Sequence, residues 1–413
     1  MTTASAPRGI LSQLFPALAE ASLRRYLGGQ VASVLGSWTQ NVTLNLLIYH
    51  LSGSAAILAL LNFLLYGLQL IVAPIAGSRI RSANAKRATL CVLMTSLLLT
   101  GSLFTLSLLG VLSVNLILAH ALAIGVSSAI ETPARQVLLL TSLEDASLTS
   151  NAVAMNTMVY NVGRMVGPTI AGFVYPTLGP RTSFVIYALA LCFMATCVRS
   201  IRTAPEERPS RSDSSLRDAV GYVMSDAFSA RYLPILACIG LFAGSYQTLV
   251  PLLADHGFHD AARFTGVFFG CAGAGSLSAA ILLSSALGPR ASGRFIAWAP
   301  WAAVAALAVL ASTTTAAASI PAFYALGFSL TFAATSTNAT IQRQCPEDVR
   351  GGLVGMYGMA YNGTMPFGYL LVGTASEALG VRDTFAAMAV VLAAGVASIV
   401  VWQRFKKQRY GAQ

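Results

Sequence analysis

Ionisable residues inside long apolar segments or at their ends are the first candidates for chemistry in this sequence. Glu131, His120 and Asp255 could each carry a proton, because carboxyl and imidazole groups titrate when they are exposed in turn to two different surroundings. Arg164 also falls within an apolar segment, where a charge is costly and therefore indicates a functional site. These residues predict proton coupling through a charge network. A lone His in such a segment is also compatible with a structural hydrogen bond, so His120 keeps both interpretations.

Arg164 requires a partner, since an unpaired Arg at the centre of a membrane costs at least about 2.5–3.5 kcal/mol. Asn161 stands one turn away, and Glu131 is the nearest plausible carboxylate. Glu131 can instead pair with Arg135 at i+4 near the membrane surface. The spacing favours this second pairing.

Polar side chains recur at helical spacing in several apolar segments and predict a substrate cavity. Polar groups in a bilayer must face protein or water, so each polar stripe points toward the protein interior. The alternative is hydrogen bonding between helices, worth only about 0.6–2 kcal/mol per contact. Aromatic residues beside the stripes suit a bulky, partly aromatic solute. The predicted cavity residues are Gln30, Trp38, Asn41, Asn45, Tyr246, Gln247, Tyr324, Thr331, Asn338, Tyr357 and Tyr361.

No sequence pattern predicts a metal, a cofactor or catalysis. His50, His256 and His259 join Asp255 at outer loop ends, where solvation is favoured over metal binding. The sequence has no nucleotide-binding loop of the G-x-x-x-x-G-K-[ST] type, which argues against ATP-driven pumping. No nucleophile, base and orienting group stand at a spacing typical of enzymes. We therefore expect a protein that is not an enzyme and has no cofactor.

The elements that must position these residues are membrane-spanning helices. A spanning helix needs about 20 mostly apolar residues, and this chain is 55% apolar and 10% charged, whereas an ordinary soluble domain is about 25% charged. The expected fold is an all-α membrane protein with twelve transmembrane helices in two pseudo-symmetric halves of six. The predicted spans are 27–50, 54–76, 89–110, 112–131, 151–175, 182–199, 232–254, 264–287, 295–312, 316–338, 352–375 and 384–402.

The basic residues are distributed unevenly between the two sides of the predicted membrane. With both termini in the cytoplasm, 22 of the 26 Lys and Arg residues fall in inside segments, and the outside loops hold only Arg181, Arg263 and Arg382. This bias follows the positive-inside rule and predicts a multi-pass protein of the bacterial inner membrane. The net charge of +11 is therefore interpreted as anchoring to the lipid bilayer, with no nucleic acid as a partner.

Short strings recur at offsets of 201 to 208 residues, about half the chain. They pair Arg25-Tyr26-Leu27 with Arg231-Tyr232-Leu233, Tyr160-Asn161 with Tyr361-Asn362, and Arg135-Gln136 with Arg343-Gln344. Parallel halves of this kind are a known transporter plan. The predicted domains are a six-helix half at 1–200, a cytoplasmic linker with an amphipathic helix at 201–230, and a second six-helix half at 231–413.

Over nearly its whole length the chain resembles the major facilitator superfamily. The strings that carry the resemblance are YLGGQVASVLGSWTQNVTLNLLIYHLSGSA, ETPARQ, NAVAMNTMVYNVGRMVGPTIAG, SLRDAVGYVMSD and QRQCPEDVRGGLVGMY. Within the superfamily, the chain is most similar to the bacterial exporters grouped with the enterobactin exporter. This resemblance implies that the first, fourth, seventh and tenth helices line the cavity.

Span five is similar to the motif G-x-x-x-G-P-x-x-G-G of exporters that exchange substrate for protons. Gly163, Gly167, Pro168 and Gly172 match it, while an alanine replaces one glycine. The resemblance implies a conformational role in antiport, whereas small residues at this spacing equally predict close helix packing. The family's G-x-x-x-D-x-x-G-R-K loop after span two is altered, with Arg81 in place of the acid. Its usual inner gate contact therefore cannot form.

The residues and the resemblance together predict a secondary transporter that works by alternating access and proton antiport. It would export a medium-sized organic compound, either a siderophore or a drug-like molecule. The expected partners are a small-molecule substrate, protons and the lipid bilayer, and the protein is expected to be a monomer. The alternatives are a lysophospholipid flippase, a ferroportin-like metal exporter, and a membrane sensor or scaffold that transports nothing.

Overall fold

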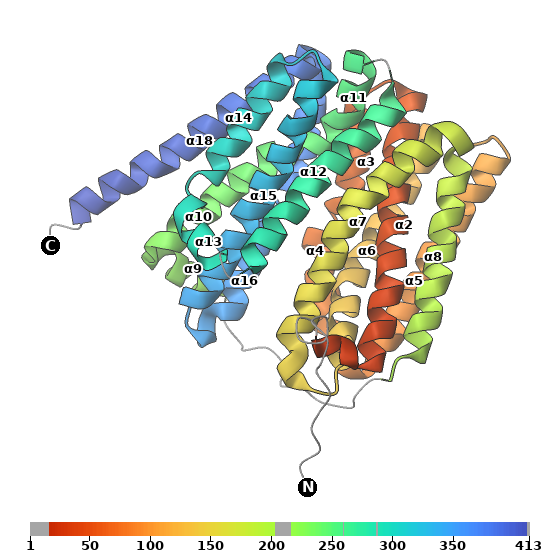
Figure 1. The fold of residues 1–413 in the computed structure, drawn as a ribbon, viewed down its shortest axis with the longest axis horizontal. Helices are drawn as coiled ribbons and strands as arrows, with labels where there is room; N and C mark the ends of the chain where they lie inside the picture. Colours follow the sequence, from red (N-terminus) through yellow and green to blue (C-terminus); the bar gives the residue numbers. More distant parts are fainter. Residues whose placement is uncertain (1–15, 203–215, 259, 286–287, 411–413) are drawn as a thin grey trace, which may run out of the picture.

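The computed structural model describes residues 16–202, 216–258, 260–285 and 288–410, and these residues form helices without a β-strand. Figure 1 shows two groups of helices that lie close together at one end and diverge toward the end where α2 begins. We call α2–α8 the N-terminal bundle and α10–α18 the C-terminal bundle. The predicted fold class, an all-α membrane protein, is confirmed.

The N-terminal bundle comprises α2 (Ala21–Ser52), α3 (Ala55–Tyr66), α4 (Gln69–Arg79), α5 (Ser82–Leu108), α6 (Val114–Thr141), α7 (Thr149–Leu178) and α8 (Pro180–Ser200). The predicted second span corresponds to α3 and α4 together. These two helices are separated by a turn that begins at Gly67, a residue with low helix propensity. The sequence pattern did not predict this interruption.

The C-terminal bundle comprises α10 (Ala227–Cys238), α11 (Tyr246–Phe258), α12 (Ala261–Ser284), α13 (Gly288–Phe295), α14 (Ala299–Ser312), α15 (Ala316–Gln344), α16 (Glu347–Tyr361), α17 (Met365–Leu379) and α18 (Val381–Tyr410). The predicted seventh span consists of α10, a π-helical turn at Ile239–Ala243 and α11. The predicted eleventh span is divided near Asn362 into α16 and α17.

Within the described residues, eight helical segments are long and apolar enough to cross a membrane. The two longest helices of the N-terminal bundle, α2 and α7, are outside this set, and they carry many of the polar side chains discussed below. Among shorter apolar helices, α14 also has the composition of a span. The count of twelve spans therefore stays a prediction beyond these eight.

Part of the predicted linker, residues 203–215, lies outside the described residues, as do residues 1–15. The segment predicted to be an amphipathic helix is α9 (Leu216–Ser225), which lies against α10 and α16. Val223 is buried there, whereas Val220 and Met224 are exposed. The limits of the three predicted domains stay a prediction.

The two bundles contact each other mainly along two pairs of helices. One pair is α7 with α12, and the other is α3 with α17. These crossings hold the bundles together where they converge in Figure 1, and the site described next lies where they diverge.

Candidate transport site

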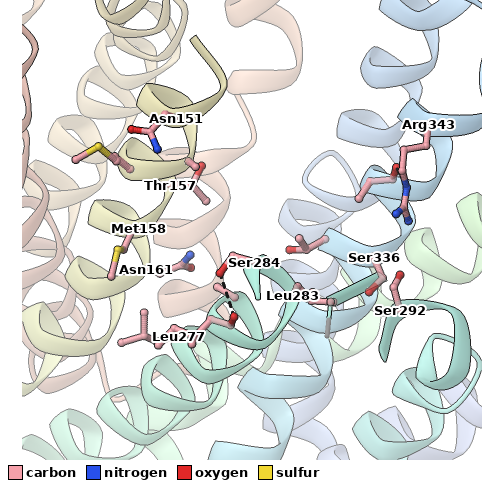
Figure 2. Close-up of a pocket in the computed structure, with 17 residues that line it drawn as sticks. Asn151, Thr157, Met158, Asn161, Leu277, Leu283, Ser284, Ser292, Ser336 and Arg343 are labelled. Carbon is pink, nitrogen blue, oxygen red and sulfur yellow. Dashed lines mark hydrogen bonds between the residues drawn. The ribbon is translucent and has the colours of Figure 1, made fainter. Parts of the chain in front are cut away.

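A pocket of about 480 Å³ lies between the two bundles. One wall is the N-terminal part of α7, and the other walls are the C-terminal ends of α12 and α15 together with α13. Figure 2 shows Met158 and Asn161 of α7 on one side and Ser336 and Arg343 of α15 on the other. The loops at these helix ends belong to the predicted cytoplasmic side.

The lining of this pocket combines apolar side chains with a few hydrogen-bonding groups. Met155, Met158 and Leu277 supply apolar surface, while Asn161 and Thr335 supply polar groups. Methionine side chains are flexible and adapt to ligands of irregular shape. A largely apolar pocket of this size with a few polar groups can hold an organic molecule of moderate size.

None of the predicted cavity residues lines this pocket. A signal for part of the lining was nevertheless present in the sequence. Thr335 belongs to the polar stripe of α15 between Thr331 and Asn338, and Asn161 belongs to the repeated Tyr-Asn string. No comparable polar pattern indicated the walls formed by α12 and α13.

Three residues beyond Asn161 along α7, Arg164 is surrounded by aromatic and polar side chains. Its guanidinium carbon lies 5.7 Å from the centroid of the Trp38 ring, a cation–π contact. Asn41 donates a 3.2 Å hydrogen bond to the Tyr66 hydroxyl. The charge of Arg164 also interacts with Tyr66 of the N-terminal bundle and with three tyrosines of the C-terminal bundle, Tyr246, Tyr361 and Tyr369. We call this group the central cluster: Trp38, Asn41, Tyr66, Arg164, Tyr246, Tyr361 and Tyr369.

The central cluster brings together several residues that the sequence singled out in separate spans. It also contains two residues that sequence analysis missed, Tyr66 and Tyr369, whose ring centroids are 6.0 Å apart. Arg164 lies over Trp38, and Glu131 pairs with Arg135 as the spacing favoured, so the partner of Arg164 is an aromatic ring and not the alternative carboxylate.

Other predicted cavity residues serve contacts inside their own bundle. Asn45 donates a 2.7 Å hydrogen bond to the carbonyl oxygen of Asn41 and accepts one of 2.8 Å from Asn62 of α3. Tyr246 is buried, and its ring centroid lies 6.0 Å from that of Phe323. These contacts hold α2 against α3 and α11 against α15.

The remaining predicted cavity residues are spread over the C-terminal bundle. Tyr324 is 41% exposed and donates a 2.8 Å hydrogen bond to Ser278 of α12. Asn338 accepts a 2.8 Å hydrogen bond from Gln342, one turn further along α15. The half-buried members of this set are Gln247, Thr331, Asn338 and Tyr357.

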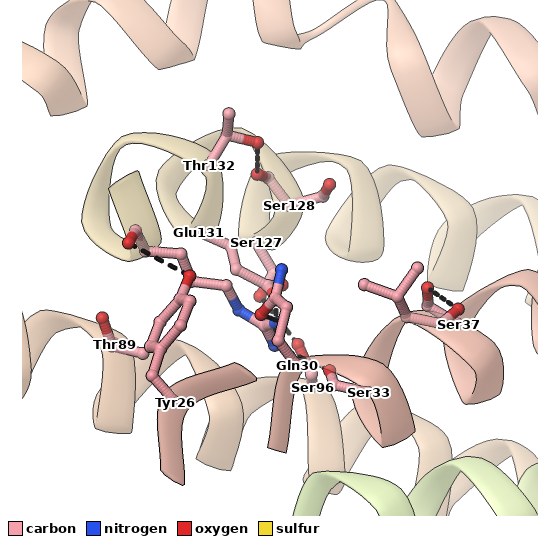
Figure 3. Close-up of polar contacts among 12 residues, drawn as sticks. Tyr26, Gln30, Ser33, Ser37, Thr89, Ser96, Ser127, Ser128, Glu131 and Thr132 are labelled. Atoms are coloured by element: carbon pink, nitrogen blue, oxygen red, sulfur yellow. Dashed lines mark hydrogen bonds and ion pairs between the residues drawn. The ribbon is translucent and has the colours of Figure 1, made fainter. Parts of the chain in front are cut away.

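Glu131 and Arg135 form an ion pair inside the N-terminal bundle, and Figure 3 shows its polar surroundings. The Arg135 guanidinium donates hydrogen bonds to Gln30 Oε1 at 2.7 Å and to Ser33 Oγ at 2.8 Å. The Tyr26 hydroxyl donates to the carbonyl oxygen of Arg135 at 3.2 Å. The side chain of Arg135 is 3% exposed and that of Glu131 is 17% exposed.

The i+4 spacing predicted this ion pair, and its location near the membrane surface stays a prediction. Arg135 is buried because Gln30 and Ser33, three residues apart on α2, give its guanidinium polar partners. Gln30, predicted to line the cavity, is therefore a partner of this ion pair. We call Glu131, Arg135, Gln30 and Ser33 the ionic network. Removing one member of a buried ion pair leaves an uncompensated charge, which costs about 3–5 kcal/mol.

The other predicted proton carriers lie in separate contacts. His120 shares a 2.8 Å hydrogen bond with Ser102 Oγ of α5 and a 2.7 Å hydrogen bond with the carbonyl oxygen of Leu116. Asp255 accepts a 3.2 Å hydrogen bond from the Tyr49 hydroxyl and lines a second pocket of about 430 Å³. The four residues predicted to form a charge network are therefore not joined in one network.

Residues 14–409 match the family model described as transmembrane secretion effector, which is part of the major facilitator superfamily. The chain belongs to this family. The predicted resemblance to superfamily exporters is confirmed, as is the prediction of a transporter that is not an enzyme. The protein is thus a multi-pass membrane protein of this transporter family.

Two curated relatives are bacterial transporters. The staphyloferrin A transporter of Staphylococcus aureus is 26% identical over 259 residues, which cover 61% of this chain and 64% of that protein, less than two thirds of its length. The multidrug efflux pump Tap of Mycolicibacterium fortuitum is 27% identical over 346 residues, which cover 80% of this chain and 83% of the pump.

Solved structures of other transporters share the fold at low sequence identity. The nucleoside transporter NupG has a TM-score of 0.73 and 12% identity, with 92% of this chain and 98% of NupG covered. An inward-facing bacterial homologue of the iron transporter ferroportin has a TM-score of 0.67 and 13% identity, with 92% and 98% covered. At these identities the similarity shows the fold alone.

The glycine motif of this family member packs α7 against two different helices. A Cβ atom on Gly167 would lie 2.4 Å from the Cβ of Trp38, and Gly163 also faces α2. A Cβ atom on Gly172 would lie 2.6 Å from the Cα of Gly266 in α12. The motif therefore allows close packing both within one bundle and between the bundles.

Helix α12 contributes a complementary glycine stripe that sequence analysis missed. Gly266, Gly270 and Gly273 all face α7, and a Cβ on Gly273 would lie 2.4 Å from the Cα of Met165. The carbonyl oxygen of Pro168 would lie 3.1 Å from a Cβ on Gly266. The spacing of these glycines in GVFFGCAG was the available signal.

Proposed function

We propose that this protein exports a medium-sized organic compound, siderophore or drug-like, from the bacterial cytoplasm in exchange for protons. The observation that carries the proposal is the pocket between the diverging bundles, with its apolar walls and few polar groups. Its position at the predicted cytoplasmic ends would let a cytoplasmic substrate enter. The siderophore and drug transporters among the relatives support the same substrate classes.

Contacts between the bundles at the opposite ends of the helices support alternating access. The Tyr49 hydroxyl of α2 donates to Asp255 of α11 at 3.2 Å. Glu377 of α17 accepts hydrogen bonds from Ser54 Oγ and, at 3.0 Å, from the backbone N–H of Ala56. These contacts close the predicted outer side while the pocket lies on the inner side, as expected of an inward-facing state.

Within the ionic network, Glu131 is the residue that we assign to proton coupling. Its charge neutralises Arg135, which in turn holds two polar side chains of α2. A proton on Glu131 would remove that neutralisation and weaken the attachment of α6 to α2. Because α6 and α2 belong to the N-terminal bundle, a proton on Glu131 would change the packing inside that bundle. It would thereby shift the equilibrium of the protein between its inward-facing and outward-facing states.

The test uses inside-out membrane vesicles, in which export appears as accumulation inside the vesicle. With a pH gradient imposed, the vesicles should accumulate staphyloferrin A or the neutral drug chloramphenicol above the level of vesicles that lack the protein. A protonophore should abolish this accumulation. If neither compound accumulates above the control, the proposed export of these two classes is wrong.

Replacing Glu131 by Gln tests the proton role separately from binding. Glu131→Gln should lower proton-driven accumulation at least about tenfold, while exchange of labelled for unlabelled substrate without a pH gradient persists. The control is Glu144→Gln, because Glu144 is an exposed carboxylate in the loop after α6. Equal loss of driven transport and exchange in Glu131→Gln would assign the residue to structure instead.

Replacing Asn41 tests whether the central cluster is a second binding site, which the substrate reaches after the pocket. Asn41→Ala removes the hydrogen bond to Tyr66 and should raise the KM of transport without lowering the amount of protein in the membrane. Unchanged KM and kcat would remove the central cluster from the proposed pathway.

A further inference from the structure

Arg343 of α15 lies at the pocket with its charge uncompensated by the carboxylates that the structure describes. It is exposed and lines the pocket between the bundles. Its side chain donates to the carbonyl oxygen of Ala339 at 3.1 Å and to Thr340 Oγ1 at 3.4 Å, both within its own helix. Figure 2 shows the side chain extending from α15 into the pocket.

The internal repeat explains why this arginine lacks the partner that its counterpart has. Arg135-Gln136 and Arg343-Gln344 are repeat mates, offset by 208 residues. Four residues before Arg135 stands Glu131, its ion-pair partner. Four residues before Arg343 stands Ala339, which has no charge and also lines the pocket. The C-terminal bundle thus keeps the cation and lacks the equivalent internal anion.

Two buried hydroxyl groups lie on the same side of the pocket as Arg343. Ser336 is two helical turns earlier on α15, and Ser292 lies on α13. Ser336 is 1% exposed and Ser292 is 5% exposed, and neither Oγ atom has a hydrogen-bond partner among the described residues. Buried hydroxyl groups are normally satisfied. Figure 2 shows both side chains next to each other, near Arg343.

We propose that this pocket binds its substrate through an anionic group, a carboxylate, that pairs with Arg343 and accepts hydrogen bonds from Ser336 and Ser292. A guanidinium and two hydroxyl groups match the acceptor positions of a carboxylate. The apolar body of the substrate then lies against the methionine side chains of α7, on the opposite wall. This assignment rests on the proposed export function and adds to it a substrate class, the amphipathic organic anion.

A second arginine, on the opposite wall formed by α7, agrees with this substrate class. Arg164 of the central cluster lies over an aromatic ring, and no described carboxylate forms an ion pair with it. An anion that leaves Arg343 therefore meets another positive charge deeper between the bundles. The pathway would favour anions over cations at both points.

The test compares two probes that share an apolar body, biphenyl-4-carboxylate and biphenyl-4-methanol. Their binding is measured by equilibrium dialysis against the full chain in phosphatidylcholine nanodiscs. The wild-type protein should bind the carboxylate about tenfold more tightly than the alcohol, as expected for a charge-assisted hydrogen bond. Arg343→Gln should remove this preference while the affinity for the alcohol stays the same.

Ala339→Glu gives an independent test, because it restores in the C-terminal bundle the i+4 carboxylate that Glu131 provides in the other. This variant should also lose the preference for the carboxylate, whereas Ala339→Gln, of equal size, should keep it. Arg294→Gln is the matched control, since Arg294 is exposed on α13 and does not line the pocket. A preference that survives in both Arg343→Gln and Ala339→Glu would overturn the proposal.

Two further measurements distinguish the proposed carboxylate binding from lipid binding and from the proposed export function. Binding is repeated in phosphatidylglycerol nanodiscs, and loss of carboxylate binding there would overturn the proposal by identifying a lipid headgroup as the occupant. Chloramphenicol accumulation in vesicles reports on export itself. Export that continues without any carboxylate preference contradicts the inference alone, while a carboxylate preference without export of either compound contradicts the proposed function alone.

Discussion

At the α7–α12 crossing glycines on both helices bring the two main chains together, whereas the α3–α17 crossing has a close glycine on one helix only, Gly373 against Ala55 and Ala59, and adds contacts between longer side chains. The first crossing has glycines on both helices, so the main chains approach closely. The second has a ring pair, Phe63 with Phe367 at 5.9 Å between centroids, and the hydrogen bonds of Glu377. Close main-chain contact leaves little to rearrange, while side-chain contacts can break and reform. We expect the first crossing to act as a pivot and the second as a latch.

The strongest test of the pivot is to force its two backbones apart. Gly172→Leu places a side chain at a position where even a Cβ atom would lie 2.6 Å from the Cα of Gly266. We expect the free energy of unfolding to fall by about 3 kcal/mol, the upper end of the range for overpacked sites, and transport to stop. Thermal melting of the purified protein and vesicle accumulation measure these effects.

The control for this change is Gly101→Leu in α5, where a Cβ atom would meet nothing within 4 Å. It carries the same helix-propensity change without the clash. A melting temperature and a transport rate that are the same in Gly172→Leu and Gly101→Leu would show that the crossing is not a tight pivot.

A smaller effect is expected when the ring pair of the latch is removed. Phe367→Ala deletes an aromatic contact worth about 0.5–1.5 kcal/mol, so the equilibrium should shift roughly two- to tenfold toward separation of the outer ends of α3 and α17. Electron paramagnetic resonance distances between spin labels on these ends measure the shift.

Phe193→Ala is the matched control for the ring pair, because Phe193 of α8 is also 51% exposed and has no ring partner among the described residues. Stability of the fold should be the same in both variants. An unchanged distance distribution in Phe367→Ala would remove the ring pair from the latch.

The smallest expected effect concerns Glu377, which lies just beyond the predicted span 352–375. Hydrogen bonds from Ser54 and from the Ala56 N–H lower the pKa of this carboxyl below its ordinary value of 4.5. Because the ionised form makes the contact, its stabilisation is present above the ordinary pKa and is lost as the pH falls through the lowered pKa. Acid on the outer side should therefore loosen the latch.

Hydrogen exchange of the Ala56 amide measures this loosening. At neutral pH the amide should exchange more slowly in the wild-type protein than in Glu377→Gln. The difference should persist at pH 4.5 and disappear only as the pH falls further, through the lowered pKa of Glu377, since the carboxyl is protonated there. A difference that persists below that pKa would mean that charge on Glu377 does not control the contact.

Much of the fold could be predicted from the sequence, because a bilayer demands long apolar helices and the basic loops set their order. The breaks within two predicted spans, near Gly67 and Asn362, could not be predicted, since an apolar run of the right length gives no sign of a turn inside it. The Glu131–Arg135 pair followed from local spacing. Its burial did not, because burial depends on which face of α2 meets α6.

The candidate site was less accessible to sequence reasoning than the fold. The polar stripe of α15 indicated a helix that lines the pocket and includes Thr335. The opposite walls depend on how far the bundles diverge, which is a property of the conformation and not of any local pattern. The role proposed for Arg343 needed both sources: the repeat identified its counterpart, and the structure showed what that counterpart contacts.

The glycine stripe of α12 has a practical consequence for attempts to redirect the protein to other compounds. A helix fitted this closely along α7 tolerates few larger side chains, so random substitutions in its middle turns would be eliminated through misfolding before any change of cargo could be selected. Variant libraries should instead concentrate on α13 and the last turns of α15, where side chains reach the pocket without separating the bundles.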